Sequence, residues 1–416
     1  MNQIDTSQEE RGQKRPLWRN RDFLLLWSGQ NVSVLGSNVS RLAMPLLVLA
    51  LTHSPAQAGL MVAVRQSPYL LFSLLAGALV DRWNRKITMI CCDAVRWLAL
   101  GSVPLAFALG HVTLVHLYIV AFVEGTGYVF FSLAQIAALP QVVEPAHLAR
   151  AYAFDTITEY VGTLFGPSLG AFIIGLASQV KAGTILAYVT DSISYLVSVV
   201  SLLFIRVSFQ MERTTEKRRA LYKEIAEGLR FLWQQRLLRI MVLLTTMVNF
   251  LQSSITLIII VLASGPLHIG VQTLGFVLSA EGVGGVLGGV VAPWMRERLR
   301  FGQIILGSVI LWAGAALVLA LAPSAPLLIV GIFVTGFLWP LYGVTLVTYR
   351  LSQTPEHLQG RVNSAFRFLS YGAEPLGAAV GGLLLVPLGG QTVLLLIAGG
   401  LALSSFVAFF TSLRKA

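Results

Sequence analysis

Long apolar stretches, each about as long as a helix that crosses a membrane, recur along the whole sequence. A hydrocarbon layer about 30 Å thick requires roughly 20 apolar residues of helix per crossing, and the sequence offers about twelve such windows between short polar breaks. A first set of six covers 23–51, 57–79, 87–109, 112–139, 152–177 and 184–205. A second set covers 240–263, 271–295, 301–321, 326–348, 362–386 and 391–410. The sequence therefore predicts an all-α membrane protein with twelve transmembrane helices.

The composition supports a lipid environment. Charged residues make up 12% of the 416 residues, about half of what a soluble chain carries, and the mean hydropathy is +0.75. Strands of a β-barrel would alternate apolar and polar residues over about ten positions, whereas these windows are apolar throughout and contain Gly and Pro, which membrane helices tolerate. The first window is too long for the core of a signal peptide, so we expect it to remain as the first spanning helix.

The net charge of +11 raises the question of a nucleic-acid partner, which the placement of the charge answers. If the N-terminus lies inside, 26 of the 30 Lys and Arg residues fall on the cytoplasmic side of the predicted helices. This asymmetry follows the positive-inside rule, so we expect both termini in the cytoplasm, a multi-pass protein of the cell (inner or cytoplasmic) membrane, and no nucleic-acid partner. The basic loops are instead suited to contact the anionic headgroups of the lipid bilayer.

The two sets of windows resemble each other. Gly59 corresponds to Gly275 and Asp81 to Glu297 at an offset of 216 residues. Such an offset predicts two pseudo-symmetric six-helix bundles around a site near the middle of the membrane. Between the sets, KEIAEGLRFLWQQRLLR has the spacing of an amphipathic helix that lies on the membrane surface. The predicted organisation is a cytoplasmic N-tail (1–22), an N-terminal bundle (23–206), a cytoplasmic linker (207–239), a C-terminal bundle (240–410) and a cytoplasmic C-tail (411–416).

The stretch GALVDRWNRK lies between the second and third windows and resembles the loop signature of the major facilitator superfamily, Gly-x-Leu-x-Asp-Arg-x-x-Arg-Lys. Every defined position is filled, by Gly77, Leu79, Asp81, Arg82, Arg85 and Lys86. A simple positive-inside anchor would explain the three bases but not Asp81. The resemblance implies that Asp81 and Arg82 belong to a clasp that holds the cytoplasmic side shut, in which Asp81 accepts hydrogen bonds from a helix N-terminus or pairs with an arginine.

A second motif, VGTLFGPSLGA in the fifth window, resembles the antiporter signature of drug exporters in this superfamily, at Gly162, Gly166, Pro167 and Gly170. Small residues four apart are also typical of ordinary helix packing, so the motif alone leaves that alternative open. The chain also resembles the macrolide-efflux and enterobactin-exporter branch in three longer stretches, NRDFLLLWSGQNVSVLGSNV, EIAEGLRFLW and GRVNSAFRFLSYGAEPLG. This resemblance covers nearly the whole chain and implies export. Many drug exporters carry an arginine where this chain has Ala121, so the proton relay of that arginine is not transferred.

Charged residues inside the predicted helices are few, and each should face a cavity or a partner because an ionised group in hydrocarbon is costly. The candidates for binding the proton or the substrate are Arg41, Arg65, Glu124, Asp155, Glu159, Glu281 and Glu374. Asp155 and Glu159 share one helix face, where two like charges favour a shared proton. The alternative is that the acids only neutralise arginines in static pairs. Arg65 and Glu281, which are equivalent in the two halves, would form such a pair in the centre.

Polar and aromatic side chains would complete a central cavity. The stretch SGQNVSVLGSN offers Gln30, Asn31, Ser37 and Asn38 beside Arg41. Candidates for adaptable apolar walls are Phe122, Tyr128, Phe130, Phe131, Phe250 and Trp339. Asp93 and Arg96, near the start of the third window, are expected to support the gate, and Asp191 to take part in packing or hydrogen bonding.

Signatures of soluble enzymes are absent from the sequence, which has no Walker loop, no GxSxG and no Cys and His at metal-binding spacing. Cys91 and Cys92 are adjacent, so we expect inert helix residues rather than a disulfide. We therefore expect no enzymatic activity, no metal, no cofactor, and a monomer driven by a proton gradient. The predicted function is secondary transport that exports amphipathic, drug-like or macrolide-like small molecules in exchange for protons. Open alternatives are a siderophore or lipid exporter, an uptake symporter, and a receptor or assembly partner that does not transport.

Overall fold

The computed structural model describes residues 17–80, 82–207, 209, 221–321, 324–355 and 358–415, and the regular secondary structure of these residues is entirely helical. The first half contains α1 (Arg21–Thr52), α2 (Pro55–Val80), α3 (Arg85–Ala108), α4 (Leu114–Val142), α5 (Leu148–Gly175) and α6 (Val180–Phe204). The helix α7 (Leu221–Gln234) follows. The second half contains α8 (Arg236–Gln252), α9 (Ile255–Ser264), α10 (Val271–Arg298), α11 (Phe301–Leu321), α12 (Ala325–Gln353), α13 (Gln359–Gly372) and α14 (Glu374–Phe409). Short 3-10 helices occur at η2 (Leu17–Arg19), η3 (Pro145–His147) and η5 (Ser412–Lys415).

Three of the helix starts in the first half, those of α1, α3 and α4, follow from local capping chemistry. Asn20 precedes α1 and its side chain accepts a hydrogen bond from the backbone N–H of Phe23 at 3.1 Å. Asn84 and Thr113 cap α3 and α4 in the same way. Each side-chain oxygen satisfies an N–H that the helix itself leaves free. The first six predicted windows accordingly each coincide with one helix.

Two of the later predicted windows are interrupted helices. The seventh window consists of α8 and α9, which are separated at Ser253 and Ser254. The eleventh begins as α13 and continues as α14 after a break at Ala373, directly before Glu374 and Pro375. Proline lacks an N–H and its ring restricts the preceding residue, so a new helix begins there.

A glycine divides α14 into two membrane crossings. The helical stretch Gln359–Phe409 has 51 residues and would be about 75 Å long if straight, more than twice the hydrocarbon thickness. Gly389 has φ 73° and ψ 163°, a conformation that only glycine adopts readily, and it interrupts the helix. Before it, Gly382 lies against α2, and after it, Ser405 donates a hydrogen bond to a carbonyl of α11. The eleven long apolar helical stretches in the described residues therefore make twelve crossings, which confirms the prediction.

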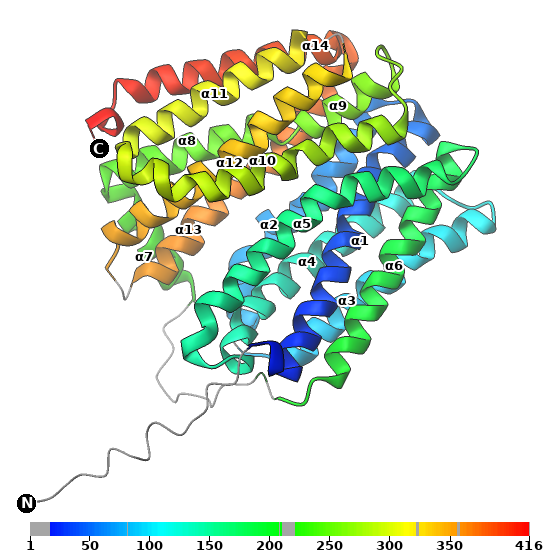
Figure 1. The fold of residues 1–416 in the computed structure, drawn as a ribbon, viewed down its shortest axis with the longest axis horizontal. Helices are drawn as coiled ribbons and strands as arrows, with labels where there is room; N and C mark the ends of the chain where they lie inside the picture. The colour runs from blue at the N-terminus through cyan, green and yellow to red at the C-terminus, as the bar shows by residue number, and fades with distance from the viewer. Residues whose placement is uncertain are drawn as a thin grey trace, which may run out of the picture.

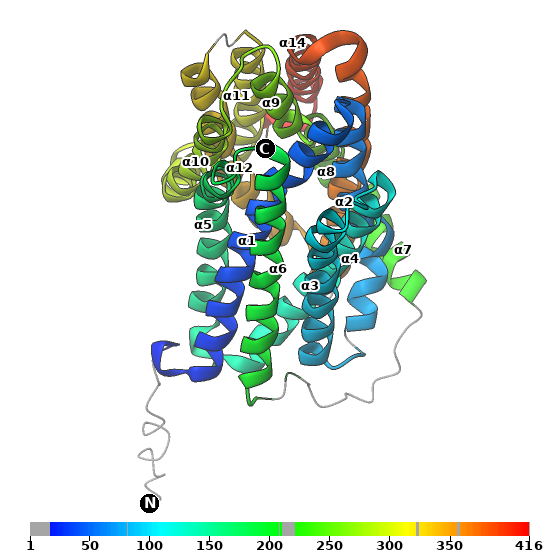
Figure 2. The same cartoon turned by 90° about the vertical axis from the view of Figure 1, so that its right-hand side faces the viewer.

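The helices pack as two bundles, one formed by α1 to α6 and the other by α8 to α14 (Figure 1). In the first, α1 packs against α5 and α6, as Figure 2 also shows, and α3 packs against α4 and α6. In the second, α12 packs against α10 and α11, while α7 lies on α13. Two main contacts join the bundles: α5 packs against α10, and α2 against α13 and α14.

The two contacts between the bundles are equivalent by pseudo-symmetry. A Cβ added to Gly59 of α2 would lie 2.6 Å from the Cα of Gly382 on α14. A Cβ added to Gly275 of α10 would meet the Cβ of Ala171 on α5 and lie 2.8 Å from the carbonyl oxygen of Pro167. Gly59 and Gly275 are the pair related by the 216-residue offset, so the internal repeat appears in the structure as two matching close contacts. Both contacts lie near the helix starts of α2 and α10, and we call that end of the molecule the closed end.

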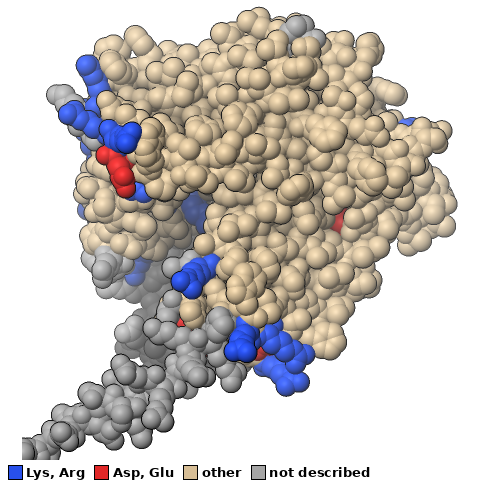
Figure 3. All heavy atoms as spheres, in the orientation of Figure 1, with Lys and Arg blue, Asp and Glu red and all other residues tan. Residues whose placement is uncertain are grey.

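The bundles separate toward the opposite end, where α1 begins, α14 ends and α7 lies, and which we call the terminal end (Figure 1). Gly77, close to this end of α2, has no neighbouring atom within 4 Å of the position of a Cβ. Figure 3 shows a hollow between the bundles on this side, with basic atoms at its floor. The structure thus has a central cleft that is open at the terminal end and shut at the closed end.

Candidate functional site

Three acidic residues from three helices lie within electrostatic reach of one arginine, Arg41. Arg41 of α1 interacts electrostatically with Glu159 of α5, with Glu281 of α10 and with Glu374 of α14. The four residues come from both bundles, so they lie where the bundles face each other. No ion pair among the described residues involves Arg41. One guanidinium charge therefore interacts with three carboxyl groups over a distance and is not bonded to any of them among the described residues.

Tyrosines and a second arginine extend this cleft. The side-chain Nε of Arg367 on α13 donates a hydrogen bond to the hydroxyl of Tyr69 on α2 at 3.1 Å, a direct polar link between the bundles. The rings of Tyr69 and Tyr371 meet edge to face with centroids 5.6 Å apart. Both tyrosines are within electrostatic reach of Glu374, and Tyr128 of α4 is within reach of Glu159. The cleft thus combines phenol rings with groups of both charges.

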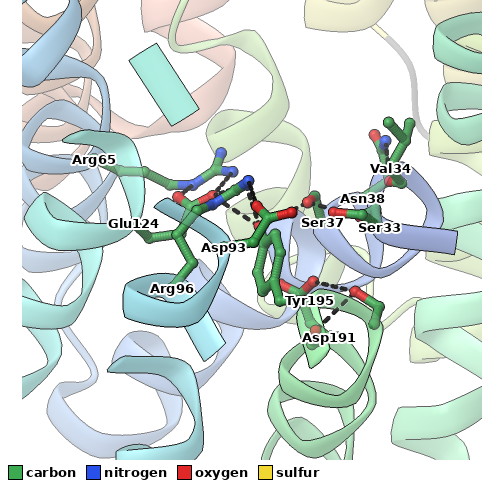
Figure 4. A network of polar contacts seen from close by, with 11 residues as sticks. Ser33, Val34, Ser37, Asn38, Arg65, Asp93, Arg96, Glu124, Asp191 and Tyr195 are labelled. Atoms are coloured by element: carbon green, nitrogen blue, oxygen red, sulfur yellow. Dashed lines mark hydrogen bonds and ion pairs between the residues drawn. The ribbon is translucent and has the colours of Figure 1, made fainter. Parts of the chain in front are cut away.

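Behind the cleft, an ion-pair network is buried inside the first bundle (Figure 4). Arg65 of α2, whose side chain is 24% exposed, donates two hydrogen bonds to Glu124 of α4, at 2.5 Å from Nε and 3.2 Å from Nη2. Glu124 is only 1% exposed and also accepts from Nη2 of Arg96 at 3.1 Å and from the hydroxyl of Tyr195 at 3.3 Å. The carboxylate of Glu124 is fully occupied by these donors.

The network continues to α1, α3 and α6. Arg96 also pairs with Asp93 at 3.2 Å, and its guanidinium lies over the ring of Tyr195, 3.9 Å from the centroid. Ser198 of α6 donates to the other oxygen of Asp93 at 2.6 Å, and Gln30 of α1 donates to Ser198 at 3.2 Å. Five helices are therefore tied together by side-chain bonds. Buried charges that are paired and hydrogen-bonded in this way avoid the cost of an isolated ion in hydrocarbon.

The structure separates the predicted charged residues into two groups. Arg41, Glu159, Glu281 and Glu374 share the cleft, whereas Arg65 and Glu124 form a static pair in the first bundle. Arg65 does not pair with Glu281, because α4 of its own bundle packs directly against α2 and supplies Glu124. Asp155 lies one turn from Glu159, toward the terminal end, and the two carboxyl groups interact.

The residues expected to support the gate lie elsewhere. Asp93 is 0% and Arg96 3% exposed, and both belong to the buried network rather than to the edge of the membrane. The physical reason is that they start two turns inside α3, on the face that α4 and α6 cover. Asp191 is 1% exposed and accepts a hydrogen bond from Ser194 at 3.2 Å.

The loop signature lies at the terminal end, and Asp81 falls outside the described residues. Arg85 donates to the carbonyl of Ala137 near the end of α4 at 2.9 Å, and Lys86 donates to the carbonyl of Ile205 just after α6 at 2.6 Å. Cations at the carboxyl ends of helices complement the helix dipole and the free carbonyls there. Arg82 is exposed, and the carbonyl of Leu79 accepts the N–H of Arg82 at 3.0 Å.

The glycines of the antiporter-like motif pack α5 against α1. A Cβ on Gly162 would lie 2.9 Å from the side-chain nitrogen of Asn38, and one on Gly166 would meet the Cβ of Asn38. A Cβ on Gly170 would lie 3.2 Å from the Cα of Val39. The adjoining face of α5 meets α10, where the hydroxyls of Ser168 and Ser279 are 2.7 Å apart. The motif thus packs α5 against α1 of its own bundle, while the adjoining face of α5 contacts α10 of the second bundle.

Sequence reasoning did not single out Tyr69, Tyr195 or Tyr371. Tyr371 was detectable, because it lies four residues after Arg367 and three before Glu374, which are positions on one helical face. Tyr69 and Tyr195 have no such signal, since a lone tyrosine in an apolar helix equally suits lipid or core.

Comparisons with known proteins agree with this architecture. The model of the family described as transmembrane secretion effector matches residues 14–416. The multidrug efflux pump Tap of Mycolicibacterium fortuitum is 26% identical over 389 residues, covering 90% of this chain and 92% of its own. The enterobactin exporter EntS of Escherichia coli O1:K1 / APEC is 23% identical over 365 residues, covering 87% and 85%. Among solved structures, a variant of the nucleoside transporter NupG has the same fold, with a TM-score of 0.77 at 15% identity over 94% of this chain and 100% of its own.

Proposed function

The chain belongs to the transmembrane secretion effector family, transporters of the major facilitator superfamily, and from this premise we propose that it exports amphipathic small molecules in exchange for protons. It is a multi-pass membrane transporter and not an enzyme. The proposal extends this to the driving ion, the direction and the substrate class.

The observation that carries the proposal is the charge imbalance around Arg41. The guanidinium of Arg41 is within electrostatic reach of Glu159, Glu281 and Glu374 and forms no ion pair with them among the described residues. Three carboxylates need more positive charge than Arg41 and Arg367 together supply, because uncompensated charge in a low-dielectric cleft is costly. Protons provide that charge in one state and a cationic substrate provides it in another. The two therefore compete for the same acids, and such competition couples their movements in opposite directions.

The orientation in the membrane follows from the positive-inside rule. With the terminal end in the cytoplasm, the described conformation opens toward the cytoplasm and is shut toward the outside. Substrate enters from the cytoplasm, and rocking of the bundles about the cleft then exposes it on the other side. In this scheme Asp81 and Arg82 of the loop signature close the cytoplasmic side after substrate binds. The exposure of Arg82 is consistent with an open clasp.

The cleft suits flat, partly apolar compounds. The rings of Tyr69, Tyr128 and Tyr371 offer aromatic faces and hydroxyls, which bind planar and cationic groups. Tap is named a multidrug efflux pump, and this resemblance also favours such substrates. A second candidate is an anionic siderophore, which Arg41 and Arg367 in the cleft would favour and for which EntS is named.

The test uses purified protein in proteoliposomes with a defined pH difference. We expect uptake of a cationic dye such as ethidium into inverted vesicles that are acidic inside, and collapse of uptake when the pH difference is removed. Glu159→Gln, Glu281→Gln and Glu374→Gln each remove one titrating acid, and at least one of these variants is expected to lose coupling. Glu144→Gln, at an exposed site between α4 and η3, is the matched control and retains it.

Two outcomes contradict the proposal. Dye movement that ignores the pH difference rules out proton coupling, and coupling that survives all three substitutions rules out the acids. Binding of dye without movement across the membrane would show a receptor instead of a transporter. Proton-coupled movement of a catecholate siderophore but not of the dye would select the second candidate.

A further inference from the structure

A groove of about 360 Å³ lies at the start of α1, apart from the central cleft. Its lining consists of Arg19, Arg21, Leu24, Leu25, Trp27 and Ser28. Both arginines are exposed, and none of the ion pairs in the described part of the chain includes either of them. Asp22, the neighbouring acid, is directed elsewhere, since its two carboxylate oxygens accept the backbone N–H groups of Arg206 and Val207 at 3.2 and 3.3 Å.

The groove faces away from the interior of its bundle. Ser28 precedes Ser37 by nine residues, and Arg21 precedes Gln30 by nine, which at 100° per residue places each pair on opposite sides of α1. Ser37 and Gln30 point inward, because they form hydrogen bonds with Tyr195 and Ser198 of α6. Arg21 and Ser28 therefore point outward, to the side of α1 that borders lipid between α5 and α6 (Figure 2).

Aromatic residues fix one wall of the groove. The indole Nε1 of Trp27 donates to the hydroxyl of Thr158 on α5 at 3.1 Å. The ring of Phe154 meets those of Trp27 and Trp18 edge to face, at centroid distances of 5.5 and 5.0 Å. Tryptophans at a helix end with arginines are typical of the boundary between hydrocarbon and headgroups. The groove therefore spans that boundary, with charge at the outer end and apolar side chains at the inner end.

We propose that this groove binds one anionic phospholipid, with its phosphate between Arg19 and Arg21 and the first part of an acyl chain along Leu24, Leu25 and Trp27. Guanidinium groups bind phosphate oxygens in pairs of hydrogen bonds, and two of them complement an anionic headgroup better than a zwitterionic one. The second bundle does not repeat the site. At the 215-residue offset that aligns LWRNR with LWQQR, Arg19 corresponds to Gln234, so one of the two guanidinium groups is missing there.

The test is native mass spectrometry of the full chain, stripped of lipid and titrated with phosphatidylglycerol or phosphatidylcholine of the same acyl chains. We expect one phosphatidylglycerol to bind well before any phosphatidylcholine. The double variant Arg19→Gln and Arg21→Gln is expected to weaken this first binding step by about 30-fold. The matched control, Arg236→Gln with Arg239→Gln, removes two charges at the same end of the second bundle and is expected to leave the step unchanged.

A second variant tests the apolar part of the groove with both arginines in place. Among the described residues Ser28 bonds only to the carbonyl of Leu25 in its own helix, so Ser28→Phe is expected to fold and to fill the groove, which weakens binding of phosphatidylglycerol. The proposal is overturned if the two lipids bind equally, if the arginine variant binds like the wild type, or if the control variant loses as much affinity. It is also overturned if Ser28→Phe leaves binding unchanged, because the acyl chain then lies elsewhere.

Discussion

Removing both Arg65 and Glu124 from the buried ion-pair network should destabilise the first bundle by less than the sum of the two single removals. Glu124→Gln leaves the two guanidinium groups of Arg65 and Arg96 facing Asp93 alone. Arg65→Gln leaves Glu124 and Asp93 facing Arg96 alone. In the double variant Arg96 remains paired with Asp93, so one positive and one negative charge remain and neutralise each other. The restored charge balance is therefore expected to offset part of the free-energy cost of the lost bonds.

The magnitude follows from burial. Removing one partner of a buried pair costs about 3–5 kcal/mol, and the lower end applies here because Arg65 is 24% exposed and solvent screens part of its charge. We expect about 3 kcal/mol for each single variant and a double variant that is more stable than their sum by roughly 2 kcal/mol. The assay is unfolding in mixed micelles with increasing SDS, followed by tryptophan fluorescence. Glu124→Gln with Asp191→Asn is the control, which removes a second acid and is expected to give no recovery. Additivity of the Arg65 and Glu124 variants within about 0.5 kcal/mol would refute the reasoning.

Three further predictions concern the cleft and the closed end. Gly59→Val places a side chain against Gly382, so we expect the closed end to open. A cysteine introduced at Ser279, which is 7% exposed at the contact of α5 with α10, should then become more reactive toward an external maleimide. Gly307→Val, where no atom lies within 4 Å of a Cβ, is the control, and unchanged reactivity in Gly59→Val would count against the close contact as the seal. Arg41→Gln removes the positive charge shared by the three acids, so we expect at least a tenfold loss of coupled transport in proteoliposomes. Arg41→Lys keeps the charge and is expected to recover part of that transport. Transport equal to wild type in Arg41→Gln would show that Arg41 has no part in coupling. Tyr69→Phe removes the hydroxyl that accepts the hydrogen bond of Arg367. At about 1 kcal/mol per hydrogen bond, its loss should change the apparent substrate affinity about fivefold. An unchanged dependence of transport on substrate concentration would show that this hydrogen bond has no part in substrate binding.

The sequence was sufficient to predict the crossings but not their internal breaks. The length of an apolar stretch indicates whether it is long enough to cross the membrane. It does not indicate whether the helix is continuous along that stretch. The interruption at Ser253 has no strong local signal, since serine is common in membrane helices. The turn at Gly389, by contrast, lies in the gap between the windows predicted at 362–386 and 391–410.

For the site, the sequence identified the charged residues but not their partners. Buried charges stand out in apolar helices, so Arg41, Arg65 and Glu124 were visible as candidates. Which acid meets which arginine depends on how the helices pack, and Arg65 meets an acid 59 residues away on a helix of its own bundle. Only the arrangement of helices in space separates a static pair such as Arg65 and Glu124 from the unpaired Arg41.

The central claim is that two bundles rock about the cleft, so that one end closes as the other opens. Spin-label distances at both ends of α5 and α10 test it most directly, in a chain whose Cys91 and Cys92 are replaced by serine. One label pair is placed at Tyr152 and Leu299 at the terminal end, and the other at Leu176 and Thr273 at the closed end; all four sites are exposed. On changing pH across the range that drives transport, we predict that the first distance shortens while the second lengthens. Two distances that stay fixed, or that change in the same direction, would contradict the account.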